Sequence, residues 1–122
     1  MIDIVKARKT LELKLEKERS LALNRYNQAV LDADAIIQCI KTEYAPQKIY
    51  QWGSLLHPER FHEYSDIDIA IEGITDAETY FRLLADAMKH THIALDIVQI
   101  EKIEPEFAAL IRQSGKIVYE RE

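Results

Sequence analysis

Cysteine, glycine and proline are all scarce in this 122-residue chain, which has one Cys, three Gly and three Pro. The single cysteine, Cys39, excludes an intrachain disulfide, and its apolar surroundings predict a buried structural thiol in a reducing compartment. The chain has no uninterrupted apolar run of about 18 residues, and its first residues lack a basic region followed by an apolar core. We therefore expect a cytoplasmic protein that is neither secreted nor inserted in a membrane.

Glycine and proline are missing altogether from the first 45 residues, and Pro46 is the first of either. Leu, Ala, Glu, Lys, Gln and Arg dominate there, which predicts a helix over about 3–43, either unbroken or with a break near 20–24. Its second half has an apolar stripe that should pack on the core. Its first half is mostly charged, and we interpret it either as a partner-facing or dimerising extension or as a solvated helix. The predicted division is an N-terminal helical extension at 1–45, packing on the core, and a compact domain at 46–122.

Positive charge is in short supply after residue 45. Residues 1–45 have eight Lys and Arg against seven Asp and Glu, whereas residues 46–122 have eight against fourteen, so the net charges are +1 and −6. Because proteins that bind a phosphate backbone need a cationic stripe, we expect no direct binding of nucleic acid. An acidic domain instead suits the capture of divalent cations.

Short strand and helix patterns alternate after Pro46. Strands are predicted at 48–52, 66–72, 92–100 and 116–119, and helices at 76–90, after a Thr75 or Asp76 cap, and at 104–113. Residues 55–64 indicate a short helix or turn followed by a loop. The predicted fold class is α/β (α+β), with a small mixed sheet of three to four strands covered by helices.

Three carboxylates and a Gly-Ser pair are the candidates for chemistry. Asp66 and Asp68 stand two residues apart on a predicted strand, so both point to one face and can hold a hard cation. Asp96 lies inside an apolar run, where a buried carboxylate is costly unless it is paired or bound to metal. Gly53-Ser54 follows a strand, where the backbone can approach a phosphate and the hydroxyl can donate to it. Taken alone, each feature is also typical of a solvated strand edge or a simple turn.

Together these residues resemble the signature of the DNA polymerase β-type nucleotidyltransferases: Gly53-Ser54, eleven residues, Asp66-x-Asp68, then an isolated Asp96. More narrowly, residues 46–120 resemble the minimal nucleotidyltransferases (MNT), small antitoxins that act beside HEPN toxins. The resemblance implies the nucleotidyltransferase fold for 46–122. It also implies that Gly53 and Ser54 hold the nucleotide triphosphate and that Asp66 and Asp68 bind two Mg²⁺ ions. Asp96 would help hold one metal and activate the attacking hydroxyl.

Residues near this signature are assigned less directly. Close members of the family have ten residues between the Ser and the first Asp, and an Arg three residues after the Ser, where this chain has eleven residues and His57. Arg60 is the nearest cation, and Ser65 adjoins Asp66, so both are predicted to assist nucleotide binding. Trp52 is most simply a core residue, and the alternative is a ring that stacks on a base.

The resemblance also implies a reaction. A nucleoside monophosphate, AMP from ATP, would pass in a Mg²⁺-dependent step to a hydroxyl of a protein partner, a tyrosine of a HEPN toxin, and silence it. The alternative is a non-catalytic antitoxin or dimerisation module that neutralises its partner by binding, and the N-terminal helix is the predicted surface for a homo-oligomer. Transfer of a nucleotide to a small molecule such as an aminoglycoside fits less well, because such enzymes usually carry a second domain. Transfer of a sugar fits less well for the same reason.

Overall fold

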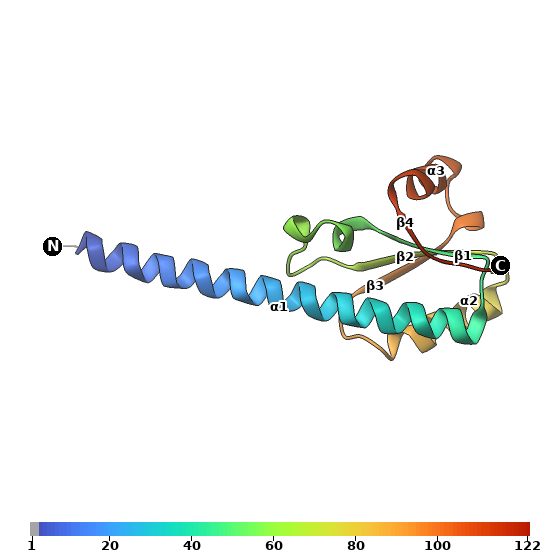
Figure 1. The fold of residues 1–122 in the computed structure, drawn as a ribbon, viewed down its shortest axis with the longest axis horizontal. Coiled ribbons are helices and arrows are strands. Elements are labelled where there is room, and N and C mark those ends of the chain that lie inside the picture. Colours follow the sequence, from blue (N-terminus) through green and yellow to red (C-terminus); the bar gives the residue numbers. More distant parts are fainter. Residues whose placement is uncertain (1–2) are drawn as a thin grey trace.

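A computed structural model describes residues 3–122 and contains one four-stranded mixed sheet (Figure 1). The strands are β1 (Lys48–Trp52), β2 (Ile67–Glu72), β3 (Leu95–Gln99) and β4 (Lys116–Glu120). Their spatial order is β3-β2-β1-β4, in which β2 and β3 are parallel and the other two pairs are antiparallel. The predicted α/β class and the small mixed sheet are confirmed.

Helices cover both faces of the sheet (Figure 1). They are α1 (Ile4–Tyr44), α2 (Ala77–Met88) and α3 (Pro105–Ser114). Alternate residues of β2 point to opposite faces, so Ile67, Ile69 and Ile71 join the core under α1 and α2. Ala70 joins the smaller core under α3. The two cores fix which side chains of each strand reach each face.

Helix α1 runs without interruption, which decides for the unbroken helix over one with a break near residues 20–24. Asp3 caps its start by accepting a hydrogen bond from the Lys6 N–H, and Ala45 ends it in the left-handed region at φ 41°. Buried residues of α1 begin at Ala29, as predicted for its second half, whereas residues 3–21 are all exposed. The N-terminal half therefore projects beyond the sheet as a single helix (Figure 1). The domain division at residue 45 stays a prediction.

The other elements begin within a residue or two of their predicted bounds, apart from β3. This strand starts at Leu95 rather than at residue 92. The Thr91 hydroxyl donates to Asp32 of α1 at 2.7 Å and accepts from the Ile93 N–H at 3.0 Å, which holds the preceding segment as a loop. Asp76 caps α2 through the Thr79 N–H. Within residues 3–122, no helix has the combined length and apolarity needed to cross a membrane.

Candidate active site

Asp68 and Asp96 lie at one end of the parallel strands β2 and β3, on the face that α3 packs against, and Asp66 lies in the loop just before β2. Asp68 and Asp96 are paired residues of the parallel strands β2 and β3. Two residues further along these strands, Ala70 and Val98 pack in the core under α3. Because side chains two residues apart share a face of a strand, Asp68 and Asp96 point to that face as well. The adjacency of the two strands, on which the predicted convergence depended, is present.

The turn after β1 touches the same carboxylates. Trp52 ends β1 opposite Asp68, and Gly53 follows with φ +80°, a left-handed conformation that favours glycine. A Cβ added at Gly53 would lie 3.0 Å from Asp68 Cγ and would overlap the carboxylate oxygen Oδ2. Glycine is required here both by the backbone conformation and by the close approach of Asp68.

Burial and mutual repulsion raise the proton affinity of two of these carboxylates. Burial, followed by the negative charges of Asp96 and Asp66, raises the pKa of Asp68 to about 7. Partial burial and the charge of Asp66 likewise raise the pKa of Asp96. All three carboxylates therefore act on one another, and nothing in this set neutralises them. Two neighbouring acids with raised proton affinity, Asp68 and Asp96, are typical of a binding or catalytic site.

The cluster is not a preformed metal cage. Within residues 3–122, no group of three or more His, Cys, Asp and Glu side chains is arranged so that it could hold a metal ion. Asp96 is also exposed, so the expectation of a buried carboxylate there is wrong, because β3 is an edge strand and Asp96 stands near its start. The donors themselves suit a hard cation, since carboxylate oxygens are what Mg²⁺ prefers.

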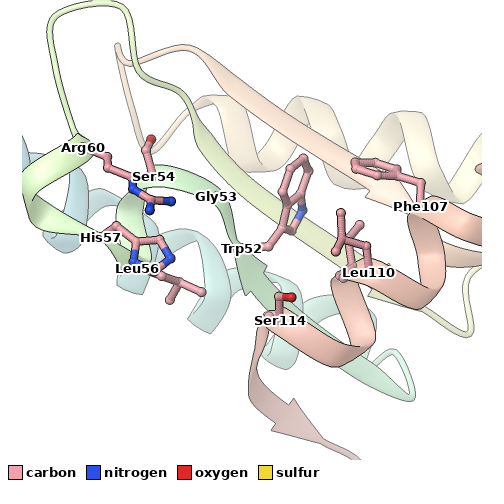
Figure 2. A pocket seen from close by; sticks show the side chains of 11 residues that line it. Trp52, Gly53, Ser54, Leu56, His57, Arg60, Phe107, Leu110 and Ser114 are labelled. Carbon is pink, nitrogen blue, oxygen red and sulfur yellow. The ribbon is translucent and has the colours of Figure 1, made fainter.

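A pocket of about 320 Å³ opens beside the Gly53 turn. Figure 2 shows Ser54, His57 and Arg60 on one side of it, Phe107 and Leu110 of α3 on the other, and Trp52 between them. The rings of Trp52 and Phe107 meet edge to face at 5.2 Å between centroids. Trp52 Nε1 is buried and has no hydrogen-bond partner among residues 3–122. The pocket thus has a polar, cationic side and an aromatic side.

Arg60 and Ser65, the two loop residues predicted to assist nucleotide binding, lie in different surroundings. Arg60 lines the pocket together with Ser54, and its part in nucleotide binding stays a prediction. Ser65 instead lies in the loop before β2, where its hydroxyl accepts a hydrogen bond from the His62 N–H at 2.9 Å. That contact, together with its burial, orders the loop that leads into Asp66. A direct contact of Ser65 with a nucleotide stays a prediction.

Sequence reasoning missed the contribution of α3 to this pocket. Phe107, Leu110 and Ser114 line it, although they lie more than 50 residues after Gly53. The only available signal was the amphipathic spacing of the helix, which predicts one apolar face but not what that face covers. Leu110 is 54% exposed, so it faces the pocket rather than the core.

A small mixed sheet with a Gly-Ser turn against carboxylates at the end of two parallel strands is the arrangement of a nucleotidyltransferase domain. The family model for polymerase beta nucleotidyltransferases matches residues 34–122. The chain therefore belongs to the polymerase β nucleotidyltransferase family. The comparison with curated proteins gave no significant match.

Solved structures share this fold. A crystal structure of a toxin-antitoxin with AMP-PNP aligns at a TM-score of 0.62 and 22% identity, over 74% of this chain and 74% of that one. The toxin-antitoxin MntA-HepT aligns at 0.56 and 20%, over 75% and 72%. A tri-AMPylated HEPN toxin from Shewanella oneidensis in complex with its MNT antitoxin aligns at 0.57 and 22%, over 76% and 73%. At these identities the likeness establishes the fold.

Proposed function

We propose that this protein is an MNT-type antitoxin that transfers AMP from ATP to a tyrosine hydroxyl of a HEPN toxin. The observation that carries the proposal is the contact between the Gly53 backbone and Asp68, beside two further carboxylates and at the mouth of a nucleotide-sized pocket. Family membership supports the transfer of a nucleotide. The shared fold of complexes with a HEPN toxin, one of them tri-AMPylated, supports the acceptor.

In this proposal Asp66, Asp68 and Asp96 hold two Mg²⁺ ions. Their carboxylate oxygens are suitable ligands, and a divalent cation would relieve the repulsion that raises the pKa of Asp68. When bound, the ions neutralise charge on the phosphates and lower the barrier to displacement. The rest of the site has to orient the nucleotide and the acceptor.

One side of the pocket would bind the phosphates of the nucleotide, and the other side would bind its base. The Ser54 hydroxyl, the Arg60 guanidinium and the His57 ring lie where phosphates would approach the Gly53 turn. Cationic and hydroxyl donors suit phosphate oxygens. Trp52 and Phe107 provide an aromatic wall for the base. This arrangement would direct the α-phosphate toward the carboxylates.

The reaction is an in-line displacement at the α-phosphate. The acceptor oxygen forms a bond to phosphorus, the bond from that phosphorus to the bridging oxygen of the β-phosphate breaks, and pyrophosphate leaves. The hydroxyl proton passes to the Asp96 carboxylate, whose pKa is raised by partial burial and by Asp66. Asp96 is exposed, so an acceptor on a separate protein can reach it. The expected setting is the cytoplasm.

Label transfer tests this function. The purified protein is incubated with α-labelled ATP, MgCl₂ and a HEPN toxin, in parallel with the Asp66→Asn/Asp68→Asn variant and an Asp34→Asn control on the exposed surface of α1. We expect label on the toxin with the wild type and the control only. If no label appears and the double variant still inhibits the toxin, the protein is an antitoxin that acts by binding alone.

A further inference from the structure

The projecting half of α1 carries apolar side chains that nothing in residues 3–122 covers. Ile4 is 70% exposed, Leu11 56% and Leu15 42%. Val5, Leu13, Leu21 and Leu23 are exposed as well but are spread over other sides of the helix, whereas Ile4, Leu11 and Leu15 share one side. Their positions along the helix show what kind of surface they form.

These residues continue the helix face that packs on the sheet further along the chain. Steps of four and three residues define this face in the projecting half, and we call it the N-terminal stripe: Ile4, Arg8, Leu11, Leu15, Glu18 and Ala22. At 3.6 residues per turn, the same face runs on to the core residues Ala29, Ala33, Ile36 and Ile40. The N-terminal stripe thus prolongs a face that is buried elsewhere, and it contains one residue of each charge.

We propose that the N-terminal stripe pairs with the same stripe of a second copy, in antiparallel orientation. In the proposed register, Leu11 of one copy meets Leu15 of the other, and Arg8 meets Glu18, so the residue numbers of every pair sum to 26. Ile4 then meets Ala22. A two-fold symmetric contact repeats each pair, so every position of the stripe has a suitable partner. The overlap of residues 4–22 is about 27 Å long.

The two charges select this orientation and register. In a parallel pair in register, Arg8 would face its own copy and so would Glu18, which places like charges together within an apolar seam. In the antiparallel register both charges are matched, and the aliphatic residues still meet one another. Charge complementarity therefore favours a second copy of this chain over an apolar partner without charges at these positions.

The base of the projecting helix can receive the end of the partner helix. Ala22 lines a hollow of about 260 Å³ together with Tyr26, Pro58 and Phe61. The proposed register brings Ile4 of the second copy to Ala22 and hence to this hollow. The partner's aliphatic side chain would fill an apolar space at the edge of the body, which extends the contact beyond the two helices.

The pairing leaves both candidate active sites open. α1 lies on one face of the sheet, whereas Asp68, Asp96 and the pocket belong to the face that α3 packs against. The dimer would hold two catalytic bodies at opposite ends of a helical rod. This proposal stands on the helix alone and does not depend on the proposed transfer reaction.

Sedimentation equilibrium of the full chain tests the pairing. We expect a dimer for the wild type, and dissociation constants raised at least about tenfold for Arg8→Glu and for Glu18→Arg, because each variant places like charges opposite each other. Lys9→Glu is the matched control for Arg8→Glu. Lys9 lies on the far side of the helix, and the two substitutions change the net charge by the same amount. Its dimer should match that of the wild type.

Exchange of the two charges tests the register itself. The Arg8→Glu/Glu18→Arg double variant should dimerise like the wild type, and an equimolar mixture of the two single variants should form a heterodimer. Three results would overturn the proposal: a wild-type monomer at roughly 100 µM, equal effects of Arg8→Glu and Lys9→Glu, or no recovery in the double variant. A wild-type monomer that binds the toxin through this helix would assign the stripe to that partner instead.

Discussion

Strand β2 carries a carboxylate at each end of the face under α3, and the protein treats the two in opposite ways. Glu72 accepts hydrogen bonds from Arg112 Nη2 at 3.1 Å and from the Tyr50 hydroxyl at 3.4 Å. Asp68 has two other carboxylates for neighbours, which together with burial raise its pKa to about 7. None of the ion pairs in the described part of the chain includes Asp68.

This difference indicates a structural role for the Glu72 end of β2 and a functional role for the Asp68 end. A paired carboxylate joins β2 to α3 and contributes to the fold. A cluster of unpaired carboxylates opposes folding and is retained where a ligand supplies the missing positive charge. Each end also has a left-handed glycine, Gly53 at φ +80° and Gly73 at φ +99°, so the two ends offer matched substitutions.

The largest difference is expected between Asp68→Asn and Glu72→Gln. Loss of the Asp68 charge removes a proposed metal ligand and should lower AMP transfer about 1000-fold, whereas Glu72→Gln should leave it within about threefold. The two variants should rank in the opposite order for their loss of stability. Asp68→Asn should raise the melting temperature, and Glu72→Gln should lower the free energy of unfolding by about 1 kcal/mol. Equal activities of the two variants would refute the functional assignment of this end.

The two glycines provide the second comparison. In Gly53→Ala the new Cβ would overlap the Asp68 carboxylate, and a displacement of this size should reduce transfer about 100-fold. In Gly73→Ala the Cβ would lie 2.9 Å from the Gln47 backbone nitrogen, away from the site. Each substitution should cost about 1–3 kcal/mol of stability through backbone strain. Label transfer and urea unfolding on both variants separate damage to the site from damage to the fold.

The third comparison is between two arginines. Arg60 lines the pocket, whereas Arg112 pairs with Glu72. Arg60→Gln should raise KM for ATP about tenfold with a smaller change in kcat, because one charged hydrogen bond to phosphate is lost. Arg112→Gln should leave KM unchanged. Steady-state kinetics with varied ATP would contradict the assignment of Arg60 if both variants gave the same KM.

The smallest effect is on the pH dependence of stability. Burial and the nearby Asp96 and Asp66 charges raise the pKa of Asp68 from 3.8 to about 7, so the folded state binds this proton more tightly than the unfolded state. The resulting stabilisation is complete below pH 4 and is lost as the pH rises through 7. In metal-free buffer the melting temperature should fall from pH 5 to pH 8 by a few degrees more than in Asp68→Asn.

The sequence predicted most of the structural elements because their signals are local. The absence of Gly and Pro before Pro46 predicted α1, and the alternation of Ile67, Ile69 and Ile71 predicted β2 with its faces. The motif residues Gly53 and Asp68 were predicted with their spacing, and the structure brings them into contact. These features depend on backbone conformation and on neighbours close in the chain.

The wrong and missed predictions concern features that are determined by contacts between residues distant in sequence. The Thr91 hydroxyl bonds to Asp32, more than 50 residues earlier, and delays the start of β3. Asp96 is exposed because its strand lies at the sheet edge, which a hydrophobic pattern does not indicate. Phe107 and Leu110 reach the pocket only because α3 folds back over β1. Such placements depend on topology rather than on residue type.

The most direct test of nucleotidyl transfer at this edge of the sheet compares two labels in ATP. With Mg²⁺, the HEPN toxin and the wild-type protein, we predict that label from the α-phosphate appears on the toxin while label from the γ-phosphate leaves with pyrophosphate. Asp68→Asn should abolish the α-label, and Glu72→Gln should retain it. Label on the toxin from γ-labelled ATP, or unchanged α-label with Asp68→Asn, would contradict this account.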